Sequence, residues 1–490
     1  MNKAAAPLWL IGALAAGLGL ALLAEAVSPA AKAQACAFPE DPTTYEGSQD
    51  RSLFLTGLDV AAFNMLLPGD PYFAVPPIET GLRDDRTTTE ARVPAVLLKA
   101  IGWIESALTQ AAADIPYEAI GPALVSFDCG YGIMQVTSGM TVPLGERGYP
   151  SPQQALIATH FAYNIARGAL ILADKWNQAP ENRPIAGTDT DGDPEIIENW
   201  YFAVWSYNGF TGPGANRSNH PMDPIYGSWP RVSYSCGPSD DGLGHNRGNY
   251  PYTELVFGCA SHPPQVNGDE LWAPQPIDLP DLNDPRWSGP LALSNFVYPY
   301  ENMDIPTPRT SAGAAAAAST PQATPSEDGA ATPTATPTES ADIAAAAGHR
   351  DPTEAPPGSA RADLFGSPSL SVSTAAVTIS LSEQGGSDSA TVTVSNPGTG
   401  ILSWLAIPSA SWLVVTPNAG IAAGDDLECA ASSLCERTAT FTIALDPTRV
   451  LPGSRSATVT VLAPGVNEQK VITVTATAVV RIGAPGVARN

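Results

Sequence analysis

The chain has 490 residues, of which 44% are hydrophobic and 15% are charged. This length and apolar content predict about two or three folded domains. Asp and Glu number 49 against 24 Lys and Arg, which gives a net charge of −25. A protein that binds a nucleic-acid backbone needs a basic surface, so we expect no nucleic-acid partner.

The first 35 residues have the features of an export signal. Lys3 precedes an uncharged apolar run over residues 8–24, and Ala33-Gln34-Ala35 is a small-x-small cleavage site. We therefore predict a protein that is secreted or associated with the cell envelope. The apolar run is long for a signal peptide, so an uncleaved membrane anchor is an alternative. Lipidation of Cys36 is a third and less favoured one, because no Leu precedes Cys36 at the usual position.

Six cysteines follow the cleavage site, and in an exported chain this number favours disulfides. Proximity in sequence favours a Cys429–Cys435 pair and then a Cys236–Cys259 pair, which leaves Cys36 for Cys129 by elimination. A zinc site is the alternative, although its spacing matches no common zinc pattern. Its ligands would be Cys236, His245, Cys259 and His262.

Composition divides the mature chain into three stretches and a tail. Residues 36–300, with a core at 90–262, contain seven of the ten tryptophans and form the first expected domain. Residues 301–365 are rich in Pro, Ala, Thr and Ser and have no aromatic residue before Phe365, which predicts a disordered linker. Residues 366–480 form the second expected domain, and residues 481–490 form the tail.

Apolar residues recur at helical spacing in the first domain. The pattern predicts helices over residues 94–108 and 153–176. A third helix is expected to begin at Asp193-Pro194, because Asp is a capping residue and Pro suits a first turn. Residues 366–480 instead alternate apolar and hydroxyl side chains between turn signals, which predicts an immunoglobulin-like β-sandwich. The expected fold is therefore multidomain: an α-rich α+β domain, a linker and an all-β domain.

Glu105 is the most informative polar residue of the first predicted helix. It lies four residues after Ile101 and three before Leu108, so it shares the apolar stripe. Burial raises the pKa of a carboxyl, which is what a general acid needs near neutral pH. The alternative is an ordinary glutamate at the end of an amphipathic helix.

Two later segments supply further candidates. Gly130-Tyr-Gly-Ile-Met-Gln135 combines glycines, which allow backbone to approach a ligand, with an amide that suits sugar hydroxyls. Trp205-Ser-Tyr-Asn-Gly209 ends the third predicted helix. Read separately, each segment also fits a turn or a core face.

Taken in order, these segments resemble the successive motifs of lytic transglycosylases of the soluble-lytic-transglycosylase type, in the lysozyme superfamily. The matching motifs are Ile104-Glu105-Ser106, Gly130-Tyr-Gly-Ile-Met-Gln135, Asn164-Ile165 with Gly168, and Trp205-Ser-Tyr-Asn-Gly209. The resemblance covers about residues 90–210. It implies a lysozyme-like fold and cleavage of the β-1,4 bond between N-acetylmuramic acid and N-acetylglucosamine in peptidoglycan.

The resemblance also assigns a role to each matched residue. Glu105 would be the single general acid/base, and the C6 hydroxyl of muramic acid would close a 1,6-anhydro ring. Ser106 would orient the site, and Tyr207 would hydrogen-bond Glu105. Asn208 shares that motif as an orienting or structural residue, and Asn164 looks structural. The residues expected to line the cleft are Gly132, Met134 and Gln135.

The departures from the family pattern keep alternatives open. Trp205 and Ser206 stand where the family usually has small residues, and an extra loop carries Asp128 and Cys129. Glycoside hydrolases usually need two carboxylates, so Asp128 would suit a hydrolytic lysozyme. A non-catalytic wall-binding protein is the alternative from another class.

We expect no cofactor, with calcium as the one alternative. Carboxylates alternate over Asp189-Thr-Asp-Gly-Asp193, and Glu198 follows, as in a calcium loop. Pro194, however, stands where an EF-hand needs its glycine.

The second domain has its own short resemblance. Ile401-Leu-Ser-Trp404 and Ser411-Trp-Leu-Val-Val-Thr-Pro417, between alternating strands, resemble the BACON family of immunoglobulin-like modules. That resemblance implies either binding of surface glycans, in addition to the peptidoglycan strands bound by the first domain, or a spacer. Trp404 and Trp412 would stack on sugars in the first case, while in the favoured alternative they fill the core.

Overall fold

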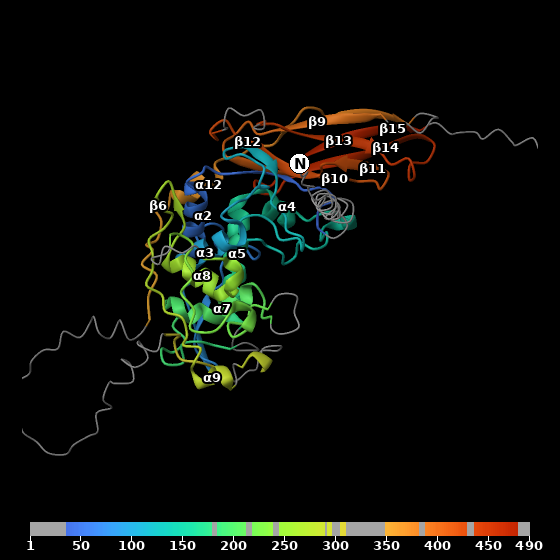
Figure 1. Cartoon of the computed structure of the whole chain (residues 1–490). Helices are drawn as coiled ribbons and strands as arrows, with labels where there is room; N and C mark the ends of the chain where they lie inside the picture. Colours follow the sequence, from blue (N-terminus) through green and yellow to red (C-terminus); the bar gives the residue numbers. More distant parts are fainter. Residues whose placement is uncertain are drawn as a thin grey trace, which may run out of the picture.

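The computed structural model describes residues 36–178, 184–211, 218–238, 245–289, 292–295, 304–309, 348–381, 388–428 and 436–478. Within them the chain forms a mainly helical part followed by an all-β part (Figure 1). The expected multidomain order is confirmed at this level. The predicted signal, the Cys429–Cys435 pair and the tail after residue 478 lie outside the described residues, as do linker residues 310–347.

The helical part is built around α3, the helix that carries Glu105. It contains α2 (Ser52–Ala62), α3 (Ala95–Ser106), α4 (Pro152–Thr159), α5 (Phe161–Asn177), α7 (Tyr201–Tyr207), α8 (Tyr252–Ser261) and α9 (Pro285–Ser288). Its short strands are β1 (Thr43–Tyr45), β2 (Ile78–Leu82), β3 (Asp85–Thr89), β4 (Ile120–Pro122), β5 (Gln265–Val266) and β6 (Asp269–Glu270). Every residue of α3 from Ala95 to Gly102 is buried, so this helix lies inside the domain.

Two of the helix predictions need correction. The helix predicted over residues 153–176 is two helices, α4 and α5, bent by 105°. His160 breaks it with an extended backbone, and its Nδ1 accepts a hydrogen bond from the N–H of Ala162 at the start of α5. The third predicted helix does not begin at Asp193, because that carboxylate closes a turn onto the N–H of Glu195. A short 3-10 helix, η2 (Ile197–Trp200), follows and leads into α7.

Two disulfides fix loops of the helical part. Cys36 bonds to Cys129, and Cys236 bonds to Cys259, so both of these predicted pairs are confirmed. The second disulfide removes both thiolates from the alternative zinc site. The first leaves no free thiol on Cys36 for a lipid.

The C-terminal part is two sheets packed face to face. One sheet has the order β12-β10-β14-β15-β8, and the other has the order β11-β13-β9-β7. Trp404, on β10, is fully buried beside the ring of Phe441, on β13. The prediction that Trp404 fills the core is confirmed, and sugar stacking on it is excluded. The strands are β7 (Ser371–Val372), β8 (Ala376–Leu381), β9 (Ser389–Ser395), β10 (Ile401–Pro408), β11 (Leu413–Thr416), β12 (Ala419–Ala423), β13 (Ala439–Leu445), β14 (Gly453–Ala463) and β15 (Glu468–Ala478).

The sandwich is docked on the helical part through β10 and β12. Ile401, Leu405 and Ile421 belong to the same buried apolar cluster as the helices. Thr159 Oγ1 hydrogen-bonds Ser403 Oγ over 2.9 Å, which joins α4 to β10. The contact is close, because a Cβ on Gly420 would lie 2.4 Å from Thr43 Oγ1.

The described ends of the predicted linker are part of the folded structure, so the linker prediction is wrong there. We call residues 348–357 the strap. Its Asp351 accepts a hydrogen bond from the N–H of Val96 at the start of α3, and its His349 contacts the buried Glu198. The short helix α12 (Ala360–Phe365) follows and buries Leu364 against the helices.

Among the described residues, no single helix combines the length and apolar character needed to cross a membrane. The bent pair α4 and α5 meets that test only when the two helices are taken together.

Candidate active site

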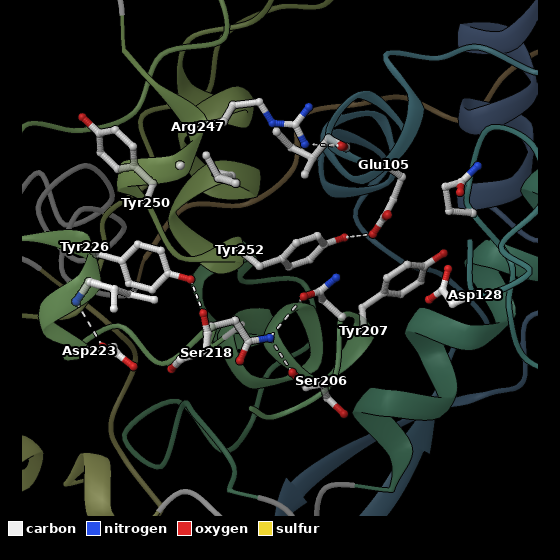
Figure 2. Close-up of a pocket in the computed structure, with 18 of the residues that line it drawn as sticks. Glu105, Asp128, Ser206, Tyr207, Ser218, Asp223, Tyr226, Arg247, Tyr250 and Tyr252 are labelled. Atoms are coloured by element: carbon white, nitrogen blue, oxygen red, sulfur yellow. Dashed lines mark hydrogen bonds between the residues drawn. The ribbon is translucent and has the colours of Figure 1, made fainter. Parts of the chain in front are cut away.

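A cleft of about 1320 Å³ opens at the C-terminal end of α3 (Figure 2). One wall comes from the matched segments, namely the end of α3, the loop of residues 126–137 and the end of α7. The opposite wall comes from residues 218–226, residues 247–250 and the start of α8. This second wall follows the matched region in sequence, and the resemblance assigns no residue in it.

Glu105 is the penultimate residue of α3, and its carboxyl faces this cleft. The hydroxyl of Tyr252, at the first turn of α8, donates a hydrogen bond of 2.5 Å to Glu105 Oε1. Burial raises the pKa of Glu105 to about 7, although the Tyr252 hydrogen bond and the charge of Arg247 act to lower it. The charge of Asp128 raises the pKa further. Near neutral pH this carboxyl is therefore poised to give and to take a proton.

The chain directly after Glu105 has an unusual backbone. Ala107 and Leu108 have φ angles of 55° and 54°, in the left-handed region that non-glycine residues rarely adopt. Leu108 turns back onto α3, where a Cβ on Gly102 would lie 2.8 Å from its side chain. Strained backbone of this kind clusters at functional sites, where the surrounding packing must hold it in place.

Ser106 ties the acid-bearing helix to the neighbouring loop. Its Oγ lies 2.9 Å from the carbonyl oxygen of Ile133 and 3.0 Å from that of Gly102. It also accepts the N–H of Thr109. Ser106 therefore fixes the end of α3 to the loop that contains Ile133.

Two residues that were expected to line the cleft lie beneath it. Gly132 and Met134 are fully buried, so the prediction that they line the cleft is wrong. Gly132 has a φ angle of 64°, and a Cβ there would lie 2.5 Å from Gln110 Oε1. Met134 fills the space over Gly168. Of the three predicted lining residues, Gln135 is the one that reaches the cleft.

Asn164 holds this loop from below, as expected of a structural residue. Its side chain accepts the N–H of Met134 over 2.9 Å and donates to the carbonyl oxygen of Tyr131 over 2.7 Å. Residues 130–134 of this motif therefore mainly form the floor of the cleft.

Tyr207 lines the cleft but does not make the predicted bond to Glu105. Its hydroxyl donates instead to the carbonyl oxygen of Met134 over 2.9 Å, and Tyr252 takes the place beside Glu105. Asn208 also lines the cleft and accepts a hydrogen bond from Asn219. Tyr207 therefore braces the loop of residues 130–136, and Tyr252 is the tyrosine that positions the acid.

The extra loop near Glu105 is anchored at Cys129 by its disulfide to Cys36. Ser126 Oγ donates to Asp128 over 2.5 Å and accepts the N–H of Gly130 over 2.8 Å. This places the Asp128 carboxylate at the edge of the cleft, where its charge acts on Glu105. Phe127 beside it is 90% exposed, at the mouth of the cleft.

Three carboxylates of the calcium alternative, those of Asp189, Asp193 and Glu198, have other partners. Asp189 pairs with Arg309, and it also accepts the N–H of Thr307. Asp193 pairs with Arg350 of the strap. Among the described residues, no three His, Cys, Asp or Glu side chains gather to hold a metal. Asp191 has a φ angle of 55°, and its carbonyl oxygen accepts the N–H of Gly81.

Comparison with known proteins adds little to this site. No protein-family model matches the chain, and no curated protein matches it. A GH5 xyloglucanase of Bacteroides ovatus, solved with a XXXG heptasaccharide, is 19% identical with a TM-score of 0.16, covering 23% of this chain and 19% of its own. A PapD-like domain of human CEP192 is 11% identical with a TM-score of 0.18, and the match covers 22% of this chain and 84% of that domain. The CooA pilin subunit of enterotoxigenic Escherichia coli is 15% identical with a TM-score of 0.17, and the match covers 23% of this chain and 100% of the pilin subunit. This chain therefore spans about a fifth of the xyloglucanase, and such low scores support no argument about function.

Proposed function

We propose that the protein is an exported lytic transglycosylase that cleaves the β-1,4 bond between N-acetylmuramic acid and N-acetylglucosamine in peptidoglycan. The observation that carries the proposal is the state of Glu105. It is a carboxyl in a large cleft, with a pKa raised to about 7 and one hydroxyl donor on it. The lysozyme-like assignment of the helical part and the BACON-like assignment of the sandwich belong to the same proposal.

The proposed reaction needs one group that acts first as a general acid and then as a general base. Protonated Glu105 gives its proton to the glycosidic oxygen as the bond to C1 of muramic acid breaks, which frees the 4-hydroxyl of N-acetylglucosamine. The C6 hydroxyl of the same muramic acid then bonds to C1, and its proton returns to the Glu105 carboxylate. No water is consumed, and the product ends in a 1,6-anhydro ring. A pKa near 7 suits both steps, because neither protonation state is strongly favoured.

A digest of purified peptidoglycan tests the proposal. We expect the mature protein to release anhydro-muropeptides, which mass spectrometry identifies as one water lighter than hydrolysis products. Glu105→Gln should lose about a thousandfold in rate, because general acid/base catalysis contributes about 10²- to 10⁴-fold. Release of no product by either protein, with wall binding intact, would make this a binding protein.

A hydrolytic lysozyme is the second candidate, and the position of Asp128 is the observation that favours it. Its carboxylate lies at the same cleft and acts on Glu105 through its charge. In a hydrolase it would activate water or stabilise the oxocarbenium ion, and Asp128→Asn would abolish the reaction. In the transglycosylase, Asp128→Asn leaves the enzyme active and lowers the pKa of Glu105. Activity would then decline at a lower pH than in the parent enzyme.

A further inference from the structure

The mouth of the cleft carries the most exposed large apolar side chain of the described residues. Phe127 is 90% exposed, although it lines the cleft that contains Glu105. Asp128, the next residue, lies on the same side of the cleft as Glu105 (Figure 2). A single exposed apolar side chain is ordinary elsewhere on a protein surface, but this one lies where a ligand enters the cleft.

The loop that carries Phe127 is held on both sides of the ring. Ser126 accepts the N–H of Gly130 on its Oγ over 2.8 Å, and its own N–H donates to the carbonyl oxygen of Gly130 over 2.9 Å. Cys129 is fixed by its disulfide to Cys36, and its N–H donates to the carbonyl oxygen of Ser126. This closed turn presents the ring at the mouth, so a ligand that covers it orders little more than the ring itself.

The opposite wall presents a second exposed apolar side chain. Ile225 lines the cleft and is 62% exposed, and its neighbour Tyr226 lies across the cleft from Asp128 (Figure 2). The polar side chains of Gln135 and Asn208 line the same cleft. A ligand that matches this lining needs apolar faces and hydrogen-bonding edges. A pyranose ring has both, because its C–H groups lie on its faces and its hydroxyls lie around its edge.

The charges at the mouth favour a sugar ring over a stem peptide as the group that covers Phe127. Asp128 directly follows Phe127, and its carboxylate lies at the edge of the cleft. The two described cations that line the cleft, Lys175 and Arg247, come from other segments. A stem peptide carries carboxylates, which Asp128 repels, whereas the face of a sugar ring carries no charge.

We propose that Phe127 is a sugar platform, a residue on which one pyranose ring of the glycan strand stacks at the mouth of the cleft. This inference rests on the proposed function and adds a substrate-binding residue to it. The family resemblance does not supply this residue, because Phe127 belongs to the extra loop in which the chain departs from the family pattern. Glu105 acts on the bond that is cleaved, whereas Phe127 holds the strand.

Binding of a peptide-free octasaccharide of alternating N-acetylglucosamine and N-acetylmuramic acid tests the platform. Calorimetry is done on the full mature chain in the Glu105→Gln background, so that cleavage does not interfere. We expect Phe127→Ala to bind about fivefold more weakly, as for the loss of one stacking contact. Phe127→Trp should bind at least as tightly as its parent. With Glu105 intact, Phe127→Ala should raise KM by the same factor and leave kcat unchanged, because the contact is equal in the ground and transition states.

The tryptophan variant also gives a direct readout of stacking. Its added emission, taken as the difference from the parent protein, should move to shorter wavelength when the octasaccharide is added, because the sugar removes the ring from water. Leu451 supplies the matched control, since it is 59% exposed and lies on the sandwich. Leu451→Ala should bind the sugar as the parent does, and the added emission of Leu451→Trp should not change.

Three outcomes would overturn the inference and leave the proposed function intact. The first is equal binding of the octasaccharide by Phe127→Ala and its parent. The second is a loss confined to peptide-bearing strands, because the stem peptide would then be the group at the ring. The third is equal weakening by the Ala and Trp variants with no emission shift, since Phe127 would then act through the shape of its loop. Failure of the Glu105→Gln protein to bind the octasaccharide would instead count against the proposed function and the inference together.

Discussion

Two carboxyls of the helical part differ in how many partners the fold gives them. Glu46 is 1% exposed, and it accepts Arg51 at one oxygen and the N–H groups of Gln110 and Ala111 at the other. Glu105 faces the cleft and accepts one hydroxyl. Burial raises the pKa of both, but at Glu46 an ion pair and two backbone donors oppose that rise. The fold thus surrounds one carboxyl with three donors and gives the other a single donor.

The largest expected effect that tests this comparison is on stability. Glu46→Gln leaves the guanidinium of Arg51 buried without its counter-charge, and breaking such a pair costs about 3–5 kcal/mol of unfolding free energy. Glu105→Gln should instead keep or raise stability above pH 7, because it removes an under-solvated charge. Urea denaturation of both variants measures the difference. Similar losses in the two proteins would contradict the comparison.

The raised pKa of Glu105 also predicts that the stability of the protein falls as the pH rises. Because the folded pKa of Glu105 lies above its unfolded value of 4.5, the folded state holds more protons between that value and about 7. The contribution of Glu105 to stability therefore falls as pH rises through this window and is constant above it. The fall between these two pH values amounts to about 3 kcal/mol, and Glu105→Gln should remove it.

The next effect concerns the tyrosine that supplies the single donor. Tyr252→Phe removes a hydrogen bond that lowers the pKa of Glu105, so the pKa should rise. Because the first step needs the protonated acid, the decline of activity at high pH should move to higher pH. The maximal rate should fall about tenfold as the carboxyl loses its orientation.

Tyr226→Phe is the matched control for this variant. Tyr226 lines the same cleft, but its hydroxyl donates to the backbone oxygen of Ser218. We expect its pH–rate profile to match that of the parent enzyme. A Tyr252→Phe profile that does not move would show that the hydroxyl does not act on Glu105.

The smallest effect concerns the opposite end of the acid-bearing helix. The residue before α3 is Pro94, which offers no capping side chain, and Asp351 of the strap accepts the N–H of Val96 instead. Asp351→Ala should therefore cost about 1 kcal/mol, as other lost helix caps do. Glu354→Ala, at an exposed strap residue, should cost nothing measurable by thermal unfolding. Equal behaviour of the two variants would exclude the capping role.

Local patterns in the sequence predict the parts of the site that depend on neighbouring residues. The apolar spacing around Glu105 places it at the end of a real helix, and the position of Ser106 follows from the same turn. Asn164 and the glycines near residue 132 also mark close packing correctly. The error over Met134 has a physical cause, because a motif shows that residues matter without showing which face of a loop they occupy.

Contacts between distant segments could not be predicted from the sequence. Tyr252 is 147 positions from Glu105, and nothing in the spacing of its own helix points to that partner. The break at His160 was missed because the capping group is an imidazole and not the Pro or Gly that usually ends a helix. The docking of the sandwich on the helices could not be predicted either, because an apolar sheet face predicts burial but does not identify the segment that covers it.

The strap and the sandwich are held to the helical part by side-chain contacts as well as by the chain itself. Asp351 holds the start of α3, Arg350 pairs with Asp193, and the sandwich that follows shares a core with the helices. A protease that cuts between residues 310 and 347 would therefore give two fragments on a denaturing gel and one particle in a sizing column. The C-terminal fragment would then stay bound to the helical part as a separate subunit.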